Sequence, residues 1–401
     1  MKVRIPREEF INRIEKLRHA MLVQNLDAVF VYGDEYRKEN LRYVSNYWPI
    51  FERGGMLLGK TGHPITLCAP EGEMLAKEMS VWDDVRLLPD FLCVTVADSI
   101  DYPLANYTSF HKLASELREA GPLQRLGVVG LDAMSVGLYH AIEHAFQCEL
   151  VDANSILLDL RRTKSVHEVA CLREAARIAD VGMQAIMQAD IIGMTEIAAC
   201  GIAEAAARRE GAEHIIFSVF GSGDRTNTIV GRPSQKIIAD GDMIMLALAV
   251  QYEGYVATCE APFAVGNYSD ETRRVIDVLI HAGAAGLPHL KAGEPMKNFV
   301  NAVRDYFKQV GLSEYDVYPP LHGIGCAEAE SPYPDSETEA CFQAGMTVNT
   351  DISLFGLPGG SNRIEEGFLI TDNGAETLSP FLRQYCERWI AQSHQKEDSH
   401  E

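Results

Sequence analysis

Met243-Ile-Met-Leu-Ala-Leu-Ala-Val-Gln-Tyr-Glu-Gly-Tyr-Val-Ala-Thr-Cys-Glu-Ala-Pro-Phe-Ala-Val-Gly266 is the stretch on which the prediction of the fold depends. Its first apolar run, Met243–Val250, is far too short to cross a bilayer, because a transmembrane helix needs about 20 apolar residues. In its second half, Glu260 is the one carboxylate among the small and apolar residues from Ala257 to Phe263. Such a carboxylate lies either on a solvated strand face or in a functional site, and we treat it as a candidate site residue.

The composition bounds the class of protein. The chain has 401 residues, of which 47% are hydrophobic and 23% are charged, and this length predicts two or more domains. Its net charge of −21 argues against a general binder of nucleic acids or anionic membranes, which would repel an acidic surface. The N-terminus has no apolar signal region, and the nine cysteines form no C-x-x-C pair. We therefore expect a soluble, cytoplasmic protein.

The first part of the chain alternates between helix and strand patterns. Apolar residues recur at helical spacing from residue 7 to residue 24, and Ala28–Tyr32 has the composition of a short buried strand. Further strand candidates occupy residues 65–68 and 126–129. This alternation predicts an α/β domain over residues 1–155.

A second domain is expected over residues 156–385. Ser165 and Glu168 have the spacing of a capping box, so a long helix is predicted to begin there. The last residues, 386–401, are polar and are expected to form a tail that frays.

Several motifs, taken in order, resemble the aminopeptidase P, methionine aminopeptidase and creatinase superfamily. The stretch quoted first resembles the central hairpin of its pita-bread fold. The resemblance covers about residues 7 to 385 and implies an α/β N-terminal domain followed by an α+β pita-bread domain. The other matching motifs, in chain order, are Leu160-Arg-Arg-Thr-Lys-Ser-Val-His-Glu168, Phe220-Gly-Ser-Gly223, Gly231-Arg-Pro233, Gly241-Asp242, His322-Gly-Ile-Gly325, Gly345-Met-Thr-Val348, Asp351 and Arg363-Ile-Glu365.

The same resemblance implies that the usual metal site is lost. Peptidases of the superfamily bind two divalent metals through Asp, Asp, His, Glu and Glu. A methyl group or a neutral hydroxyl cannot replace a bridging carboxylate on a hard cation, so we expect no cofactor, with a single Mn or Zn ion as the alternative. Two substrate-binding histidines of the peptidases correspond to Val230 and Ala329. The positions that match the metal ligands are Ala247, Thr258, His322, Asp351 and Glu365.

Creatinase is the relative that keeps this fold and works without metal. Its hairpin carries a Glu that matches Glu260, and it also uses the Glu that matches Glu365. Its N-terminal domain supplies a Phe-x-Arg to the site of the partner subunit, which matches Phe51-Glu-Arg53 and implies a homodimer. Its catalytic His matches Val230, so the resemblance does not support creatine hydrolysis itself.

The resemblance places three carboxylates around one cavity with His322. Without metal these carboxylates repel one another, so either a proton is shared or a cation such as a guanidinium, an ammonium or a single metal ion fills the pocket. We expect His322, Glu260 and Glu365 to act as acid–base catalysts. The candidate substrate-binding residues are Asp351, Arg53, Phe51 and the loop residues Asp224 and Arg225.

Four functions stay open. The leading hypothesis is a creatinase-like hydrolase that cleaves a C–N bond in a small, zwitterionic amidine or amide metabolite by acid–base chemistry. The second is a metallohydrolase similar to Xaa-Pro dipeptidase or aminopeptidase, with a metal site rebuilt from Glu260, His322, Asp351 and Glu365. A lyase and a non-enzymatic binding protein on the same fold are the other two. The expected partner is a small-molecule substrate, not a nucleic acid or a membrane.

Overall fold

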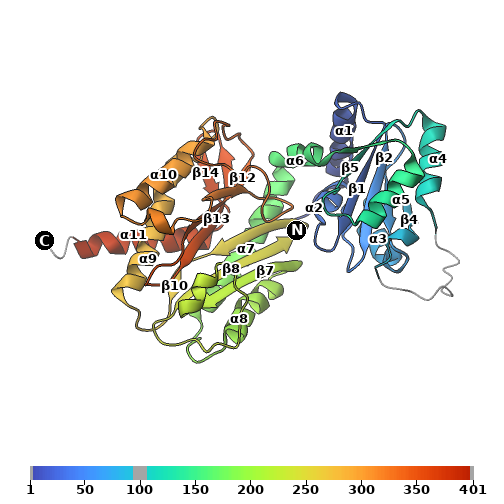
Figure 1. Ribbon diagram of the computed structural model, residues 1–401. Coiled ribbons are helices and arrows are strands. Elements are labelled where there is room, and N and C mark those ends of the chain that lie inside the picture. Colours follow the sequence, from blue (N-terminus) through green and yellow to red (C-terminus); the bar gives the residue numbers. More distant parts are fainter. Residues whose placement is uncertain (1–2, 94–105, 398–401) are drawn as a thin grey trace. The chain divides into compact units, whose positions relative to one another are not determined.

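The computed structural model describes residues 3–93 and 106–397, and the chain divides into two compact units (Figure 1). The N-terminal unit is Ile5–Arg161, and the C-terminal unit is Arg162–Glu401 together with Met1–Arg4. This division falls a few residues after the boundary expected at residue 155. Among the described residues, no helix is both long and apolar enough to cross a membrane.

The N-terminal unit is built on a mixed six-stranded sheet in the order β4-β3-β2-β1-β5-β6. Strand β1 is parallel to β5 and antiparallel to β2. The strands are β1 Ala28–Asp34, β2 Arg53–Gly59, β3 Ile65–Cys68, β4 Val85–Leu87, β5 Arg125–Val129 and β6 Glu149–Asp152. The helices are α1 Arg7–Val23, α2 Glu39–Ser45, α3 Glu73–Met79, α4 Phe110–Ala120, α5 Val136–Phe146 and α6 Asn154–Arg162.

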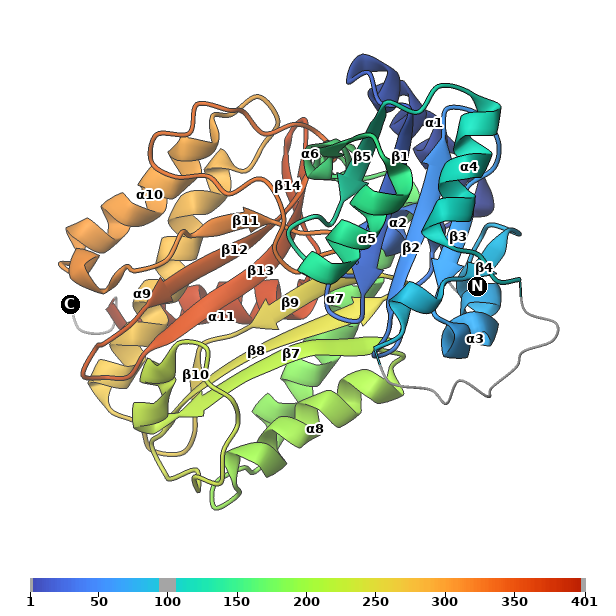
Figure 2. The same cartoon turned by 45° about the vertical axis from the view of Figure 1, so that its right-hand side comes forward.

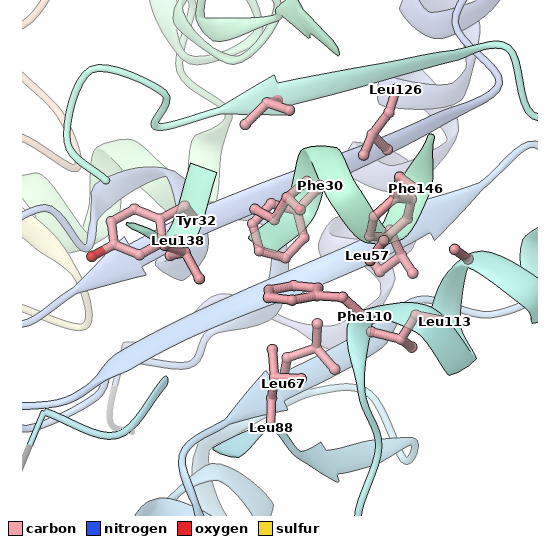
Figure 3. Packing of buried hydrophobic residues seen from close by; sticks show 14 of the residues in the cluster. Phe30, Tyr32, Leu57, Leu67, Leu88, Phe110, Leu113, Leu126, Leu138 and Phe146 are labelled. Atoms are coloured by element: carbon pink, nitrogen blue, oxygen red, sulfur yellow. The ribbon is translucent and has the colours of Figure 1, made fainter. Parts of the chain in front are cut away.

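Aromatic rings pack between this sheet and helices α4 and α5 (Figure 3). The ring of Phe110 lies edge-on to that of Phe30 with centroids 5.9 Å apart, and its centroid is 6.2 Å from that of Phe146. All three side chains are almost fully buried. Burial of such rings is the main source of stability for this unit, because each removes a large apolar area from water.

The C-terminal unit contains an eight-stranded sheet, in which β10-β8-β9-β13-β12-β11 follow one another, β7 pairs with β8 and β14 pairs with β13. The strands are β7 His214–Ser222, β8 Met243–Tyr252, β9 Tyr255–Glu260, β10 Phe263–Ala264, β11 Leu321–Gly323, β12 Thr347–Leu354, β13 Asn362–Thr371 and β14 Gly374–Thr377. The helices are α7 Val166–Gln188, α8 Glu196–Arg209, α9 Asp270–Gly286, α10 Met296–Gln309 and α11 Pro380–Glu397. Short 3-10 helices span Gly223–Thr228, Leu287–His289 and Ser313–Tyr315 in this unit. Two more, Pro70–Gly72 and Pro89–Phe91, belong to the N-terminal unit.

Helices α7, α9 and α11 lie on one side of this sheet (Figure 2). Side chains that point toward them make contacts with the helices: the Cys259 thiol donates to Asp180 of α7 at 3.4 Å, and Glu366 pairs with Arg383 of α11 at 3.2 Å. Because successive strand residues point to opposite faces, the neighbours of Cys259 and Glu366 point away from the helices. Glu260 and Glu365 are such neighbours.

The hairpin expected from the quoted stretch is formed by β8 and β9. Its two-residue loop is Glu253-Gly254, and both residues have positive φ, at 49° and 85°. Two successive residues with positive φ form the tight turn that suits the twist of a hairpin, and a glycine at the second position is its usual occupant. The capping box at Ser165 and Glu168 is also present and begins α7.

The C-terminal residues differ from the polar tail expected over 386–401. Helix α11 continues as far as Glu397, and the last four residues lie outside the described part of the chain. Its polar face is held to α9, because the Trp389 indole N–H and the Ser393 hydroxyl both donate to Asp277, at 3.1 and 3.0 Å. Composition alone does not reveal these contacts.

Candidate active site

One cross-strand row brings the predicted site residues together. The register pairs Val219 with Ala247, Ala247 with Glu260, Glu260 with Glu365 and Glu365 with Asp351. Residues opposite one another in a sheet project from the same face, so the row places three carboxylates side by side on the face away from the helices. His322 belongs to the next strand, β11, where it pairs with Asn349 of β12.

The guanidinium of Arg363 lies among these carboxylates. Its Nε is 3.0 Å from Glu260, and its Nη1 is 3.1 Å from Glu365 and 3.4 Å from Asp351. Arg363 stands two residues before Glu365 on β13, so both side chains point to the same face. The Glu260 contact is close, but its geometry is not that of a hydrogen bond, and both Glu260 oxygens lack a hydrogen-bond partner among the described residues. The chain therefore supplies its own cation to the cluster.

Burial controls the protonation of two of the carboxyls. It raises the pKa of Glu260 to about 8, with Arg363 opposing the shift and Asp351 adding to it. It also raises the pKa of Glu365 well above its ordinary value, with Asp351 adding to the effect and Arg363 again opposing it. Both shifts favour the neutral acid, because one arginine compensates only part of the charge of three buried carboxylates. The sequence left open whether a shared proton or a cation relieves the repulsion, and this cluster combines the Arg363 guanidinium with carboxyls whose pKa values are raised.

A cavity of about 830 Å³ opens on this face of the sheet. Its walls include His322, Asp351 and Glu365 from the predicted set, together with Arg363 and Ala247. Glu260 is fully buried and lies behind Arg363 rather than on the wall. The other lining residues are Glu204, Ile216, Phe217, Ser218, Val219, Val230, Gly231, Arg232, Pro233, Tyr318, Pro319, Leu321, Glu328, Ala329 and Tyr333.

His322 and Glu328 form a pair on the cavity wall. The His322 Nδ1 lies 2.9 Å from the carbonyl oxygen of Gly323, which makes Nδ1 the protonated nitrogen of the neutral ring. Its Nε2 then carries the free lone pair, and this atom lies 3.8 Å from Glu328. The Thr258 hydroxyl donates to Glu328 at 3.0 Å. Thr258 thus occupies a position where the resemblance implies a metal ligand, but its hydroxyl hydrogen-bonds to the Glu328 carboxylate.

Sequence reasoning missed Glu328 and the role of Arg363. The sequence identifies Arg363 only as part of a motif, although its spacing of two residues from Glu365 on a strand indicates that both side chains point to the same face. Glu328 follows the His-Gly-Ile-Gly motif in a turn, and nothing in its local pattern distinguishes it from an exposed glutamate.

The loop residues Asp224 and Arg225, expected to bind substrate, lie in the short helix Gly223–Thr228 and outside the cavity lining given above. Arg225 instead pairs with the buried Glu196 at 3.0 Å and donates to the carbonyl of Arg232 at 2.8 Å. It therefore shapes the loop that carries Arg232.

Phe51 and Arg53 belong to the N-terminal unit. The Phe51 side chain is 53% exposed and its φ is 44°, a conformation that is uncommon for a bulky residue. Arg53 begins β2 and makes long contacts of 3.5 Å with the carbonyls of Asp90 and Leu92. Their proposed role in the site of a partner subunit stays a prediction.

Comparison with known proteins decides the family. Residues 170–372 match Metallopeptidase family M24, and residues 13–163 match the Creatinase/Prolidase N-terminal domain. The chain belongs to metallopeptidase family M24. It is 31% identical over 263 residues to the uncharacterized peptidase YqhT of Bacillus subtilis, which covers 65% of this chain and 74% of that protein.

Named relatives extend the match over nearly the whole chain. An Xaa-Pro dipeptidase of Pyrococcus furiosus is 25% identical over 374 residues, or 93% of this chain and 99% of its own. Among solved structures, the Xaa-Pro dipeptidase from Bacillus anthracis has a TM-score of 0.78 at 25% identity and covers 92% of this chain and 98% of its own. These matches confirm the prediction of an α/β N-terminal domain followed by a pita-bread domain.

This M24 member does not have the donors for the dinuclear metal site that the family name implies. Ala247 and Thr258 offer no carboxylate, and the remaining carboxylates of the row are in contact with Arg363. Within the described ranges, no group of three or more His, Cys, Asp or Glu side chains is arranged to hold a metal ion. A metal ion at this position would meet a guanidinium held 3.0–3.4 Å from the same oxygens. The residues at this site therefore do not fit a pair of divalent metal ions.

Proposed function

We propose that this M24 member is a hydrolase that cleaves the C–N bond of a small, dipeptide-like amide by acid–base chemistry of its own side chains. The observation that carries the proposal is the His322–Glu328 pair on the wall of a cavity that Glu365, a carboxyl whose pKa burial raises, also lines. A base and an acid on the wall of one cavity are the groups that hydrolysis of an amide requires.

His322 is the proposed general base. Its Nε2 takes a proton from water as the water oxygen attacks the amide carbon, and the resulting imidazolium faces Glu328 at 3.8 Å. The nearby carboxylate stabilises that positive charge, while the Gly323 carbonyl keeps the ring in the required tautomer. Thr258 fixes the carboxylate by its hydrogen bond.

Glu365 is the proposed general acid. Burial raises its pKa and so favours the protonated form, which can give its proton to the departing nitrogen as the C–N bond breaks. The imidazolium of His322 then returns a proton to Glu365, which restores the starting state. Arg363 lies on the cavity wall beside Glu365 and offers positive charge to the oxygen of the tetrahedral intermediate.

The relatives favour an amide of dipeptide size over the amidine metabolite of the leading sequence hypothesis. The two named relatives compared above are Xaa-Pro dipeptidases, one by sequence over 93% of this chain and one by structure. A cavity of about 830 Å³ has ample room for a dipeptide. The proposed substrate class is therefore that of the dipeptidase-like hypothesis, while the proposed metal-independent acid–base chemistry is that of the creatinase-like hypothesis.

Hydrolysis of a panel of dipeptides, including Ala-Pro, tests the proposal by the release of free amino acids. His322→Ala and Glu328→Gln are expected to lower kcat/KM by about a hundredfold or more, since positioned acid–base groups contribute roughly 10²–10⁴ in rate. His289→Ala is the matched control, because His289 also lies next to a glutamate, Glu294, at 2.9 Å but outside the cavity. Full activity of both cavity variants, or no hydrolysis of any dipeptide by the unmodified protein, would overturn the proposal.

A further inference from the structure

Arg232 is a cation on the cavity wall that no ionic partner neutralises within the described ranges. Its side chain is exposed and lines the cavity. Its main chain is fixed on both sides, because its own carbonyl accepts from Arg225 at 2.8 Å and the carbonyl of Gly231 accepts from the Phe220 N–H at 2.9 Å. An arginine with a fixed backbone and a free guanidinium is suited to hold a carboxylate.

The loop that carries Arg232 is held from beneath by Glu196. This carboxylate is fully buried and accepts hydrogen bonds from Ser222 and Ser234 in addition to its pairing with Arg225. Hydrogen bonds from both serines and from Arg225 hold the pKa of Glu196 below its ordinary value despite its burial, so it remains charged. The loop is thus preorganised before any ligand arrives.

The other end of this loop is strained and joined to the carboxylate cluster. Ile229 has a φ of 63° and a ψ of −63°, which is an outlier for a β-branched residue. Its carbonyl accepts from Arg363 Nη2 at 2.9 Å. Strain of this kind persists only where the surrounding contacts enforce it, and it is commonly found at ligand sites.

Glu204 of α8 is the complementary anion. Its carboxylate is half-buried and lines the same cavity. It accepts from the Ser218 hydroxyl at 2.7 Å and from the Cys200 thiol at 3.6 Å, but it has no cationic partner in the described part of the chain. Glu204 also lines a second hollow, whose other lining residues belong to α8 and β7.

The other ionisable groups of the cavity wall contact one another. Arg363 contacts Asp351 and Glu365, and His322 faces Glu328. Within the described ranges, Arg232 is a cation of this wall without an anionic partner and Glu204 is an anion without a cationic partner, so a ligand can supply the opposite charge to each. A buried or half-buried charge gains most from a ligand that pairs with it, and opposite charges on one wall select a dipolar molecule.

We infer that Arg232 and Glu204 are the specificity-determining pair of this cavity and bind the two ends of a zwitterionic substrate. Arg232 receives the carboxylate and Glu204 receives the ammonium. The inference rests on the proposed function for the identity of the cavity, and it adds the charge pattern of the substrate. Apolar side chains of the cavity lining, including Val219 and Val230, are available to the body of the ligand.

Three ligands separate the two contacts: Ala-Pro, its C-terminal amide, which lacks the carboxylate, and N-acetyl-Ala-Pro, which lacks the ammonium. Equilibrium binding is measured by calorimetry in a His322→Ala background, in which the proposed hydrolysis is slow. We expect Ala-Pro to bind about tenfold more tightly than either analogue, since each lost charge-assisted hydrogen bond costs roughly a factor of ten or more.

Substitutions assign each preference to one residue. Arg232→Met should abolish the preference for Ala-Pro over its amide and leave the preference over N-acetyl-Ala-Pro, and Glu204→Gln should do the reverse. Arg209→Met is the matched control, because Arg209 is an exposed arginine in the last turn of α8 that lies outside the cavity lining. The control should keep both preferences.

Three results would overturn the inference: equal binding of the three ligands, no binding of any of them, or preferences that survive both substitutions. Hydrolysis of Ala-Pro by the unmodified protein reports on the proposed function separately. A protein that selects the zwitterion without hydrolysing it would retain this inference and lose the proposed function. If the unmodified protein hydrolyses Ala-Pro but the variants keep its ligand preferences, the proposed function is retained and this inference is lost.

Discussion

At the scale of single residues, Arg363 provides the positive charge that its neighbouring carboxylates require. A buried carboxylate lowers stability unless it is paired with a cation or protonated. In this cluster the carboxyl groups lie 3.0–3.4 Å from Arg363, and the pKa values of Glu260 and Glu365 are raised. We therefore expect the protonation of the cluster to affect both activity and stability.

Glu260→Gln should reduce the pH dependence of stability in the C-terminal unit. The ordinary pKa of Glu260 is 4.5, and in the folded protein it is about 8. Between these values the folded state binds a proton that the unfolded state lacks, so the free energy of unfolding falls as the pH rises toward 8. In Glu260→Gln this group does not titrate. Between pH 6 and pH 8 the free energy of unfolding should therefore fall by about 2 kcal/mol less in the variant than in the unmodified protein.

Hydrogen exchange of the β9 amides at the two pH values, corrected for intrinsic exchange rates, measures this difference. Glu366 and Asp180, whose pKa values burial raises to about 7 and about 6, contribute in the same direction and remain in the variant, so some pH dependence should persist. Glu314→Gln, at an exposed position of the same unit, is the control. An unchanged pH dependence in Glu260→Gln would show that Glu260 is ionised in the folded protein.

Activity should depend on the protonation of Glu365. Because burial raises its pKa, Glu365 keeps its proton to a higher pH than an exposed glutamate, and kcat for dipeptide hydrolysis should fall on the alkaline side as this proton is lost. Glu365→Gln should abolish the proposed proton donation to the leaving nitrogen and remove that alkaline limb. A pH profile of kcat that keeps the limb in the variant would assign it to another group.

At the scale of elements, side chains along β8, β9 and β13 alternate between the cavity side and the helix side of the sheet. Ala247, Glu260 and Glu365 face the cavity side, while their neighbours Leu248, Cys259 and Glu366 face the helices. The sequence predicted the hairpin and the capping box of α7, because both depend on a few adjacent residues. It did not predict that Arg363 and Glu328 would join the site, since those contacts depend on strand register and on a turn.

Helix α7 packs closely against β8, and glycine substitutions test this. A Cβ at Gly182 would lie 2.4 Å from Leu248 Cδ2 and 3.0 Å from the Ala203 carbonyl oxygen, and Leu248 is fully buried. Gly182→Ala should therefore destabilise the unit by about 1–3 kcal/mol through overpacking. Exchange of the β8 amides measures the effect.

Gly201→Ala is the matched change in α8. A Cβ there meets no atom within 4 Å, and alanine has the higher helix propensity, so this variant should be more stable by up to about 1 kcal/mol. Equal effects of the two substitutions would mean that α7 is not packed against β8 as described.

At the scale of the whole molecule, an ordered series of short motifs was enough to predict the fold. No single motif is specific, but their order along most of the chain matches one architecture, and the comparisons with M24 relatives confirm it. The site was predictable in part: His322, Asp351 and Glu365 lie together on the cavity wall, and Glu260 contacts Arg363 behind it. Arg232 and Glu204 belong to this wall through the position of a loop and a helix, which no local pattern shows.

The metal requirement of Ala-Pro hydrolysis tests the central claim most directly. Activity and metal content should be measured on the same sample after dialysis against a chelator, and again after addition of Mn. We predict that hydrolysis persists when the protein holds far less than one metal ion per chain, and that Mn does not increase it. Loss of hydrolysis on chelation, with recovery as one or two Mn ions bind each chain, would contradict the account and favour the hypothesis of a rebuilt metal site.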